Sequence, residues 1–122
     1  MNNMDVAQRE PVWMAVSTLY LDTEVQWYSY RAIAKVIKES PYTLDEIKVI
    51  NKTEVFPVLV TNLISVAGVW SGFDEAWLTE EITKSLYNRN RLKKLWSTLT
   101  FKMFSKMFDE HWEAVERYIK EE

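Results

Sequence analysis

The residue types that can perform chemistry are few in this sequence, and their spacing matches no common catalytic arrangement. The chain has no cysteine and a single histidine, His111, which stands among acidic residues near the C-terminal end. A nucleophilic serine needs a base within reach, and the nucleophile elbow needs the pattern Gly-x-Ser-x-Gly. Ser71 stands instead in the pattern Gly-x-x-Ser-Gly. We therefore expect no catalytic residue and predict that the chain is not an enzyme.

Metal and cofactor sites are not indicated either. Metal ligands recur at short spacings, and the sequence contains no Glu-x-x-His pair, no His-x-x-x-His pair and no calcium-loop pattern. Two glycines cannot build a glycine-rich phosphate loop. The closely spaced carboxylates at 74–81 can in principle act as acid and base, but they are typical of a solvated helix face. We expect no metal ligand, no cofactor-binding residue and no cofactor.

The charged residues are segregated along the chain, although the formal net charge is only −3. Residues 1–81 hold twelve acids and six bases, residues 82–108 hold seven bases and no acid, and residues 109–122 hold six acids and two bases. These blocks can neutralise one another within the fold, or a block of one sign can steer a partner.

The basic block forms a second candidate patch. It is interleaved with Trp96, Phe101 and Phe104, a pattern that can meet nucleic acid. The acidic remainder of the chain would repel phosphates, which makes nucleic acid the less favoured partner. The candidate basic residues are Lys84, Arg89, Arg91, Lys93 and Lys94.

The elements that must position these charges are helices. With two glycines and three prolines in 122 residues, the backbone offers few points for tight hairpins. Apolar residues recur at helical spacing, which predicts an all-α, compact single-domain bundle of about six to seven helices over residues 1–122. Residues 54–69 are rich in valine and leave a buried strand pair open. We favour a buried helix there, with Pro57 in its first turn.

Helix boundaries are indicated by capping residues. Thr43 and Glu46 have the spacing of a capping box, and Asp74 precedes a further helix. Asp22 or Thr23 is the expected N-cap of a helix that ends near residue 39. Two separate helices are expected to divide the C-terminal part near residues 107 and 108. The first of these two has an apolar stripe at Leu92, Leu95, Trp96, Leu99, Met103 and Met107.

Neither a signal peptide nor a membrane span is indicated by the sequence. The first ten residues are polar, and the longest apolar stretch, Val55–Trp70, is interrupted by proline, threonine, asparagine and glycine. This stretch is too polar to serve as a bilayer span, which needs about 18 apolar residues. We expect a soluble, cytoplasmic protein with no membrane partner.

Several short motifs resemble those of a known family. They are Arg9-Glu10-Pro11-Val12-Trp13, Ser40-Pro41-Tyr42-Thr43-Leu44, Glu54-Val55-Phe56-Pro57-Val58-Leu59 and Gly68-Val69-Trp70-Ser71-Gly72-Phe73-Asp74. Residues 9–86 thereby resemble a family of small bacterial helical proteins that are similar to immunity proteins of polymorphic toxin systems, of the type VI and Rhs kinds. The C-terminal helices at 88–122 lie outside this resemblance. It implies an architectural role for Pro57, Gly68, Trp70, Gly72, Phe73, Asp74 and Trp77.

The resemblance implies an immunity protein that binds and neutralises a cognate toxin or effector domain by protein–protein contact. Many toxins that attack nucleic acids have basic clefts, so the acidic block is the natural contact surface. Two alternatives stay open, namely a helical adaptor or chaperone for a secreted effector and a nucleic-acid-binding regulator that uses the basic patch. The oligomeric state is also open. The candidate contacts are Asp22, Glu24, Asp45, Glu46, Asp74, Glu75, Glu80 and Glu81.

Overall fold

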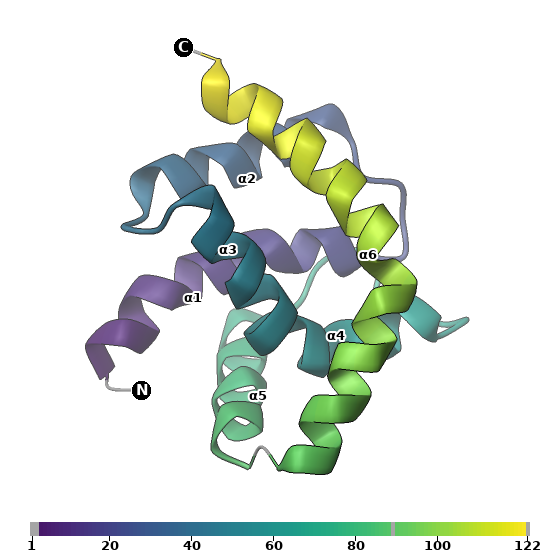
Figure 1. Cartoon of the computed structure of the whole chain (residues 1–122). Coiled ribbons are helices and arrows are strands. Elements are labelled where there is room, and N and C mark those ends of the chain that lie inside the picture. The colour runs from purple at the N-terminus through teal and green to yellow at the C-terminus, as the bar shows by residue number, and fades with distance from the viewer. Residues whose placement is uncertain (1–2, 89, 122) are drawn as a thin grey trace.

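A computed structural model describes residues 3–88 and 90–121, and the regular structure of these residues is entirely helical. No strand occurs among them, so the all-α prediction is confirmed and the strand pair considered for residues 54–69 is wrong. Figure 1 shows the helices packed around a common centre, with the long C-terminal helix crossing one side. The elements are α1 (Asn3–Ser17), η1 (Thr18–Tyr20), α2 (Trp27–Glu39), α3 (Leu44–Ile50), η2 (Asn51–Val55), α4 (Phe56–Ile64), α5 (Glu75–Tyr87) and α6 (Arg91–Lys120).

The prediction of six to seven helices is wrong, because two pairs of expected helices are joined. In the described chain, α3, η2 and α4 follow one another without a break from residue 44 to residue 64. The C-terminal part is likewise one helix, α6, rather than two. Five separate helical segments result. No glycine or proline stands at residues 50–56 or 100–115, so neither joint contains a residue that favours a turn.

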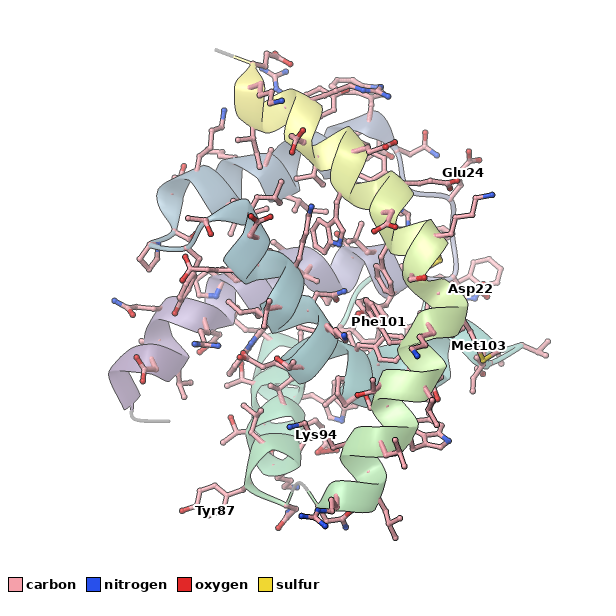
Figure 2. The ribbon with its side chains drawn as sticks, viewed as in Figure 1. Asp22, Glu24, Tyr87, Lys94, Phe101 and Met103 are labelled. Atoms are coloured by element: carbon pink, nitrogen blue, oxygen red, sulfur yellow. The ribbon has the colours of Figure 1, made fainter. Side chains whose placement is uncertain are left out.

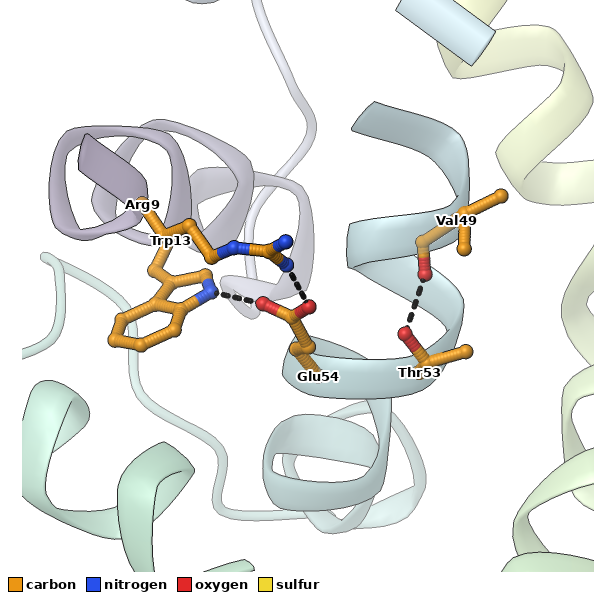
Figure 3. Close-up of polar contacts among 5 residues, drawn as sticks. All are labelled: Arg9, Trp13, Val49, Thr53 and Glu54. Carbon is orange, nitrogen blue, oxygen red and sulfur yellow. Dashed lines mark hydrogen bonds and ion pairs between the residues drawn. The ribbon is translucent and has the colours of Figure 1, made fainter. Parts of the chain in front are cut away.

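Pro57 explains why the first joint contains a π-helical turn. A proline inside a helix lacks the N–H donor, and its ring clashes with the carbonyl four residues earlier. The wider turn η2 comes immediately before it, and the Phe56 N–H donates to the Asn51 carbonyl five residues back. The Thr53 hydroxyl adds a bond to the Val49 carbonyl at 2.8 Å, as Figure 3 shows. Prolines and π turns are the usual sites at which a helix bends without ending.

The expected caps are confirmed at two helices and wrong at a third. Thr43 and Glu46 form a complete capping box at α3, and the Asp74 carboxylate accepts from the Trp77 N–H at α5. Helix α2 begins later than expected, at Trp27, and its N-cap is Gln26 rather than Asp22 or Thr23. The Asp22 N–H donates to the Val69 carbonyl at 2.7 Å, which holds this segment in a loop against the α4–α5 connection.

A cluster of aromatic rings forms the centre of the core. Tyr20, Phe56 and Phe108 are fully buried and lie in mutual ring contact, with centroids 5.4 to 6.5 Å apart. Phe101 meets the Phe56 ring edge-on at 5.0 Å. Each buried ring of this kind contributes roughly 1.5–3 kcal/mol through the hydrophobic effect alone. The cluster joins η1, α4 and α6, which are distant in the sequence.

A buried polar group ties α1 to the π turn. The Glu54 side chain accepts from the Trp13 indole N–H at 2.8 Å and pairs with the Arg9 guanidinium, and Figure 3 shows both contacts. The exposed fraction of the Glu54 side chain is only 8%. The Arg9 guanidinium also lies over the Tyr42 ring, 5.3 Å from its centroid. A buried carboxylate is tolerated only with such partners.

We predict that the Arg9→Met substitution lowers the free energy of unfolding by about 2–3 kcal/mol, because it removes the cation that compensates a buried carboxylate. Urea denaturation followed by circular dichroism measures the change. Arg31→Met is the matched control, since Arg31 is 64% exposed and its contact with Glu121 spans 4.0 Å. That control should change stability by less than about 0.5 kcal/mol. Equal losses in both variants would show that the Glu54 group is not important for stability.

Candidate interaction surface

Helix α6 carries apolar side chains on two opposite faces of its N-terminal half. The inner face consists of Phe101, Phe104 and Phe108, with the buried Ser97 one turn earlier; these residues recur at helical spacing and are buried or half-buried against the core. The other face is exposed to solvent. Figure 2 shows the contrast, with Phe101 directed toward the centre of the molecule and Met103 directed away from it. We call the second face the outer stripe; it consists of Leu92, Leu95, Trp96, Leu99 and Met103.

The exposure of the outer stripe is unusual for residues of this type. Its five side chains are between 52% and 78% exposed. They are three to four residues apart, so they form one continuous surface along the helix. A helix with apolar residues all round is normally buried, and a contiguous exposed apolar patch commonly marks a binding site. The sequence pattern identified the stripe as helical, and the structure shows that its side chains face solvent rather than the core.

A groove borders the outer stripe between α4, α5 and α6. Its volume is about 500 Å³. Pro57, Val58 and Trp96 supply apolar walls, and Trp96 belongs to the outer stripe as well. Lysines from two helices line the same groove, so we call it the basic groove. Its polar lining is Glu81, Lys84, Ser85, Asn88, Lys93, Lys94 and Ser97.

The structure thus brings together three of the five residues of the predicted basic patch. Lys84 contacts Glu80 at 3.1 Å and Glu81 at 4.0 Å, and the hydrogen bond that Lys84 donates to Glu80 raises the pKa of Lys84. Lys93 and Lys94 lie across the groove on α6. Arg91 is exposed at the start of α6, outside the groove lining, and Arg89 lies outside the described residues.

The eight acidic candidates do not form a single patch. Asp22 and Glu24 lie in the η1–α2 loop beside α6, and Figure 2 shows them on the side of α6 away from α5. Asp45 and Glu46 stand in the first turn of α3. The remaining four, Asp74, Glu75, Glu80 and Glu81, lie at the start of α5 or on it.

The α5 group gains one acid that sequence reasoning missed. Glu10 of α1 hydrogen-bonds with Glu75, and this bond together with partial burial raises the pKa of Glu10. Helices α1 and α5 pack against each other, so Glu10, Glu75, Glu80 and Glu81 are carried by one helix pair. Only the proximity of α1 and α5 creates this grouping, and no local sequence pattern signals it.

Six of the seven residues with an expected architectural role lie in or directly beside the α4–α5 loop, between Gly68 and Trp77, whereas Pro57 lies in the first turn of α4. Asn62 is the centre of this region, because its side chain accepts from the Val69 N–H at 2.7 Å and donates to the Tyr20 carbonyl at 2.5 Å. A side chain at Gly68 would lie 3.0 Å from the Asn62 carbonyl, which explains the glycine. Gly72 has a positive φ of 132°, a conformation that other residues rarely adopt.

Three of those residues are aromatic and differ in burial. Phe73 is half-buried and stacks on Trp77 with ring centroids 6.1 Å apart. Trp77 remains 44% exposed and Trp70 is 67% exposed. The loop therefore adds exposed rings to the surface, in addition to shaping the connection between α4 and α5.

His111 is the single histidine of the sequence, and its surroundings suit a structural role. Its Nδ1 lies 2.7 Å from the Tyr30 hydroxyl, which joins α6 to α2. Burial lowers the pKa of His111 below the ordinary 6.5, and the nearby Glu110 opposes that shift only in part.

Within residues 3–88 and 90–121, no three metal-binding side chains come together, and no helix is long and apolar enough to cross a bilayer.

The pKa of His111 leads to a prediction about stability and pH. His111 binds a proton less tightly in the folded state than in the unfolded state. The contribution of neutral His111 to stability is therefore complete above pH 6.5 and is lost as the pH falls through the pKa of the folded state. We expect the free energy of unfolding to decline between pH 7 and pH 5, and to decline less in His111→Gln. Urea titrations at several pH values measure both curves. Parallel curves would contradict the lowered pKa.

Comparison with known families assigns most of the chain to one of them. Residues 7–118 match the family described as Domain of unknown function (DUF7079). The match includes nearly all of α6, and so extends beyond residues 9–86. No curated protein and no solved structure matches the chain. The protein, with its outer stripe and basic groove, is a member of the DUF7079 family.

Proposed function

We propose that this protein is an immunity protein, which binds a cognate antibacterial toxin in the cytoplasm and neutralises it by protein–protein contact. The observation that carries the proposal is the outer stripe of α6. Five large apolar side chains on one solvent-facing helix surface are suited to a macromolecular partner, because a small ligand cannot cover them. The motif resemblance over residues 9–86 directs the proposal toward toxin neutralisation.

The rest of the surface suits this function without any chemistry by the chain itself. A helical scaffold holds the stripe in place before the partner arrives, and such preorganisation reduces the entropy cost of association. Exposed Trp70, Trp77 and Trp96 add side chains of the type that most often dominates binding energy. The acids on α1 and α5 offer a second contact surface, of opposite charge, for a basic region of the toxin.

A nucleic-acid-binding regulator is the second candidate, because three lysines line one groove. Two observations count against it. Glu81 lines the same groove, and the outer stripe is mostly aliphatic, whereas nucleic-acid surfaces use aromatic rings on which bases stack. An adaptor for a secreted effector would use the same protein-binding surface, and only a cellular experiment separates it from an immunity protein.

We predict that deleting this gene makes cells sensitive to sister cells that deliver the toxin encoded beside it. The measurement is survival in mixed culture, with the toxin gene intact in the attacker. Wild-type protein should restore survival, whereas the Leu95→Ser, Leu99→Ser double variant should bind the toxin at least tenfold more weakly and restore it poorly. Val49→Ser on α3 is the matched control, because the exposed fraction of Val49, 59%, is similar to those of Leu95 and Leu99, 56% and 54%.

Two results would contradict the proposed function. Survival that is unaffected by the deletion, combined with loss of effector secretion, would identify an adaptor instead. Binding that disappears in high salt and leaves only nucleic acid would identify a regulator, since phosphate contacts depend steeply on salt.

A further inference from the structure

We propose that the outer stripe and the basic groove together receive an acidic amphipathic helix of a partner protein. The proposal deepens the proposed function, on whose protein-binding role it rests, by naming the chemistry of the segment that is bound. In this arrangement, apolar side chains of the partner helix cover the leucines of α6. Its carboxylates then meet the lysines beside them.

The charges around the stripe select an acidic partner. Residues 82–108 contain no acid, so α6 itself carries no negative side chain before Asp109. Lys102 and Lys106 are exposed on the same half of the helix, and Lys93 and Lys94 line the groove at its start. Among the described residues, Lys93 and Lys94 form no ion pair. Their charges are available to a carboxylate from outside.

These lysines are not explained by the stability of α6 itself. The first turn of a helix carries a partial positive charge, so cations there are unfavourable. Arg91, Lys93 and Lys94 nevertheless stand in the first turn of α6, which has no acid in that turn. The arrangement lowers the stability of the monomer, and the carboxylates of an acidic partner would offset this loss.

A second copy of the chain does not suit this surface. Two copies that met along their outer stripes would bring Lys102 and Lys106 of both helices together, because these lysines follow the stripe at helical spacing, and like charges at an interface suppress association. The acids of α6 begin only at Asp109, beyond the end of the stripe at Met103. The same lysines therefore hinder self-association.

A bilayer surface suits it less well than a protein helix does. Basic amphipathic helices can lie on anionic lipid. However, the stripe here borders a concave groove of about 500 Å³ that contains Ser85, Asn88 and the buried Ser97. A flat bilayer cannot fill such a groove, whereas a protein side chain can enter it and hydrogen-bond with these groups.

The test uses the full chain and two synthetic peptides as probes. Both peptides have leucine at helical spacing; the remaining positions are glutamate in one peptide and lysine in the other. Nuclear magnetic resonance of the ¹⁵N-labelled protein identifies the residues that each peptide contacts, and the Trp96 indole signal is assigned with Trp96→Phe. We expect the glutamate peptide to shift signals from the basic groove and residues 91–103, and to bind at least tenfold more tightly than the lysine peptide.

Charge reversal supplies the matched comparison. Lys93→Glu with Lys94→Glu should weaken binding of the glutamate peptide at least tenfold. Arg31→Glu with Lys35→Glu on α2 makes the same change in net charge and should have little effect on that binding. Thermal melting checks that both variants fold. If the first variant does not fold, Lys93→Gln with Lys94→Gln replaces it, with the same direction of change expected.

Several outcomes would overturn the inference. They are equal binding of both peptides, no binding, shifts confined to another surface, a concentration-dependent dimer that Leu99→Glu abolishes, and binding to phosphatidylglycerol vesicles in the absence of peptide binding. None of these measurements involves a toxin. Failure here with protection intact would therefore leave an immunity protein that binds through another surface. Success here without protection would leave an acidic-helix receptor with another role.

Discussion

The ring cluster around Phe56 is the interaction on which the surface of this protein depends. Phe101, Phe104 and Phe108 all meet the Phe56 ring, and they stand on one side of α6. Their contacts fix the rotation of α6 about its own axis, because a helix can turn only one face toward a given neighbour. Once these rings point inward, Leu95, Leu99 and Met103 must point outward. The exposed stripe is therefore a direct consequence of core packing rather than an independent feature of the surface.

The sequence predicted local structure well and long-range contacts poorly. The caps at Thr43 and Asp74 follow from residues within three positions of each other, so periodicity and capping rules identify them. The Glu54 group joins residues that are 41 and 45 positions apart, and only the meeting of α1 with η2 reveals it. The one signal of this group in the sequence is the position of Glu54, an acid directly before the apolar residues Val55 and Phe56. The joint at η2 was missed because a proline ordinarily indicates a helix start.

The candidate surface likewise combines local patterns that the sequence predicts with an arrangement in space that it does not. Periodicity found the outer stripe as a helical pattern, and the charge blocks found the lysines of the groove. Neither could show that the stripe faces solvent, because α6 has apolar residues at two helical registers and the pattern alone does not say which register meets the core. The acidic candidates were chosen by their position in the chain. The structure divides them among the η1–α2 loop, α3 and α5, so they do not form one acidic surface.

An exposed apolar stripe is a liability for a protein that must wait for its partner, because such patches favour aggregation. The lysines beside the stripe reduce that liability, since two copies repel each other wherever their stripes approach. The same charges attract an acidic helix, so one set of residues both prevents self-association and selects the partner. Attraction of an acidic partner explains why cations persist in the first turn of α6, where the helix dipole disfavours them. A surface that served only solubility would place its charges where the helix itself gains from them.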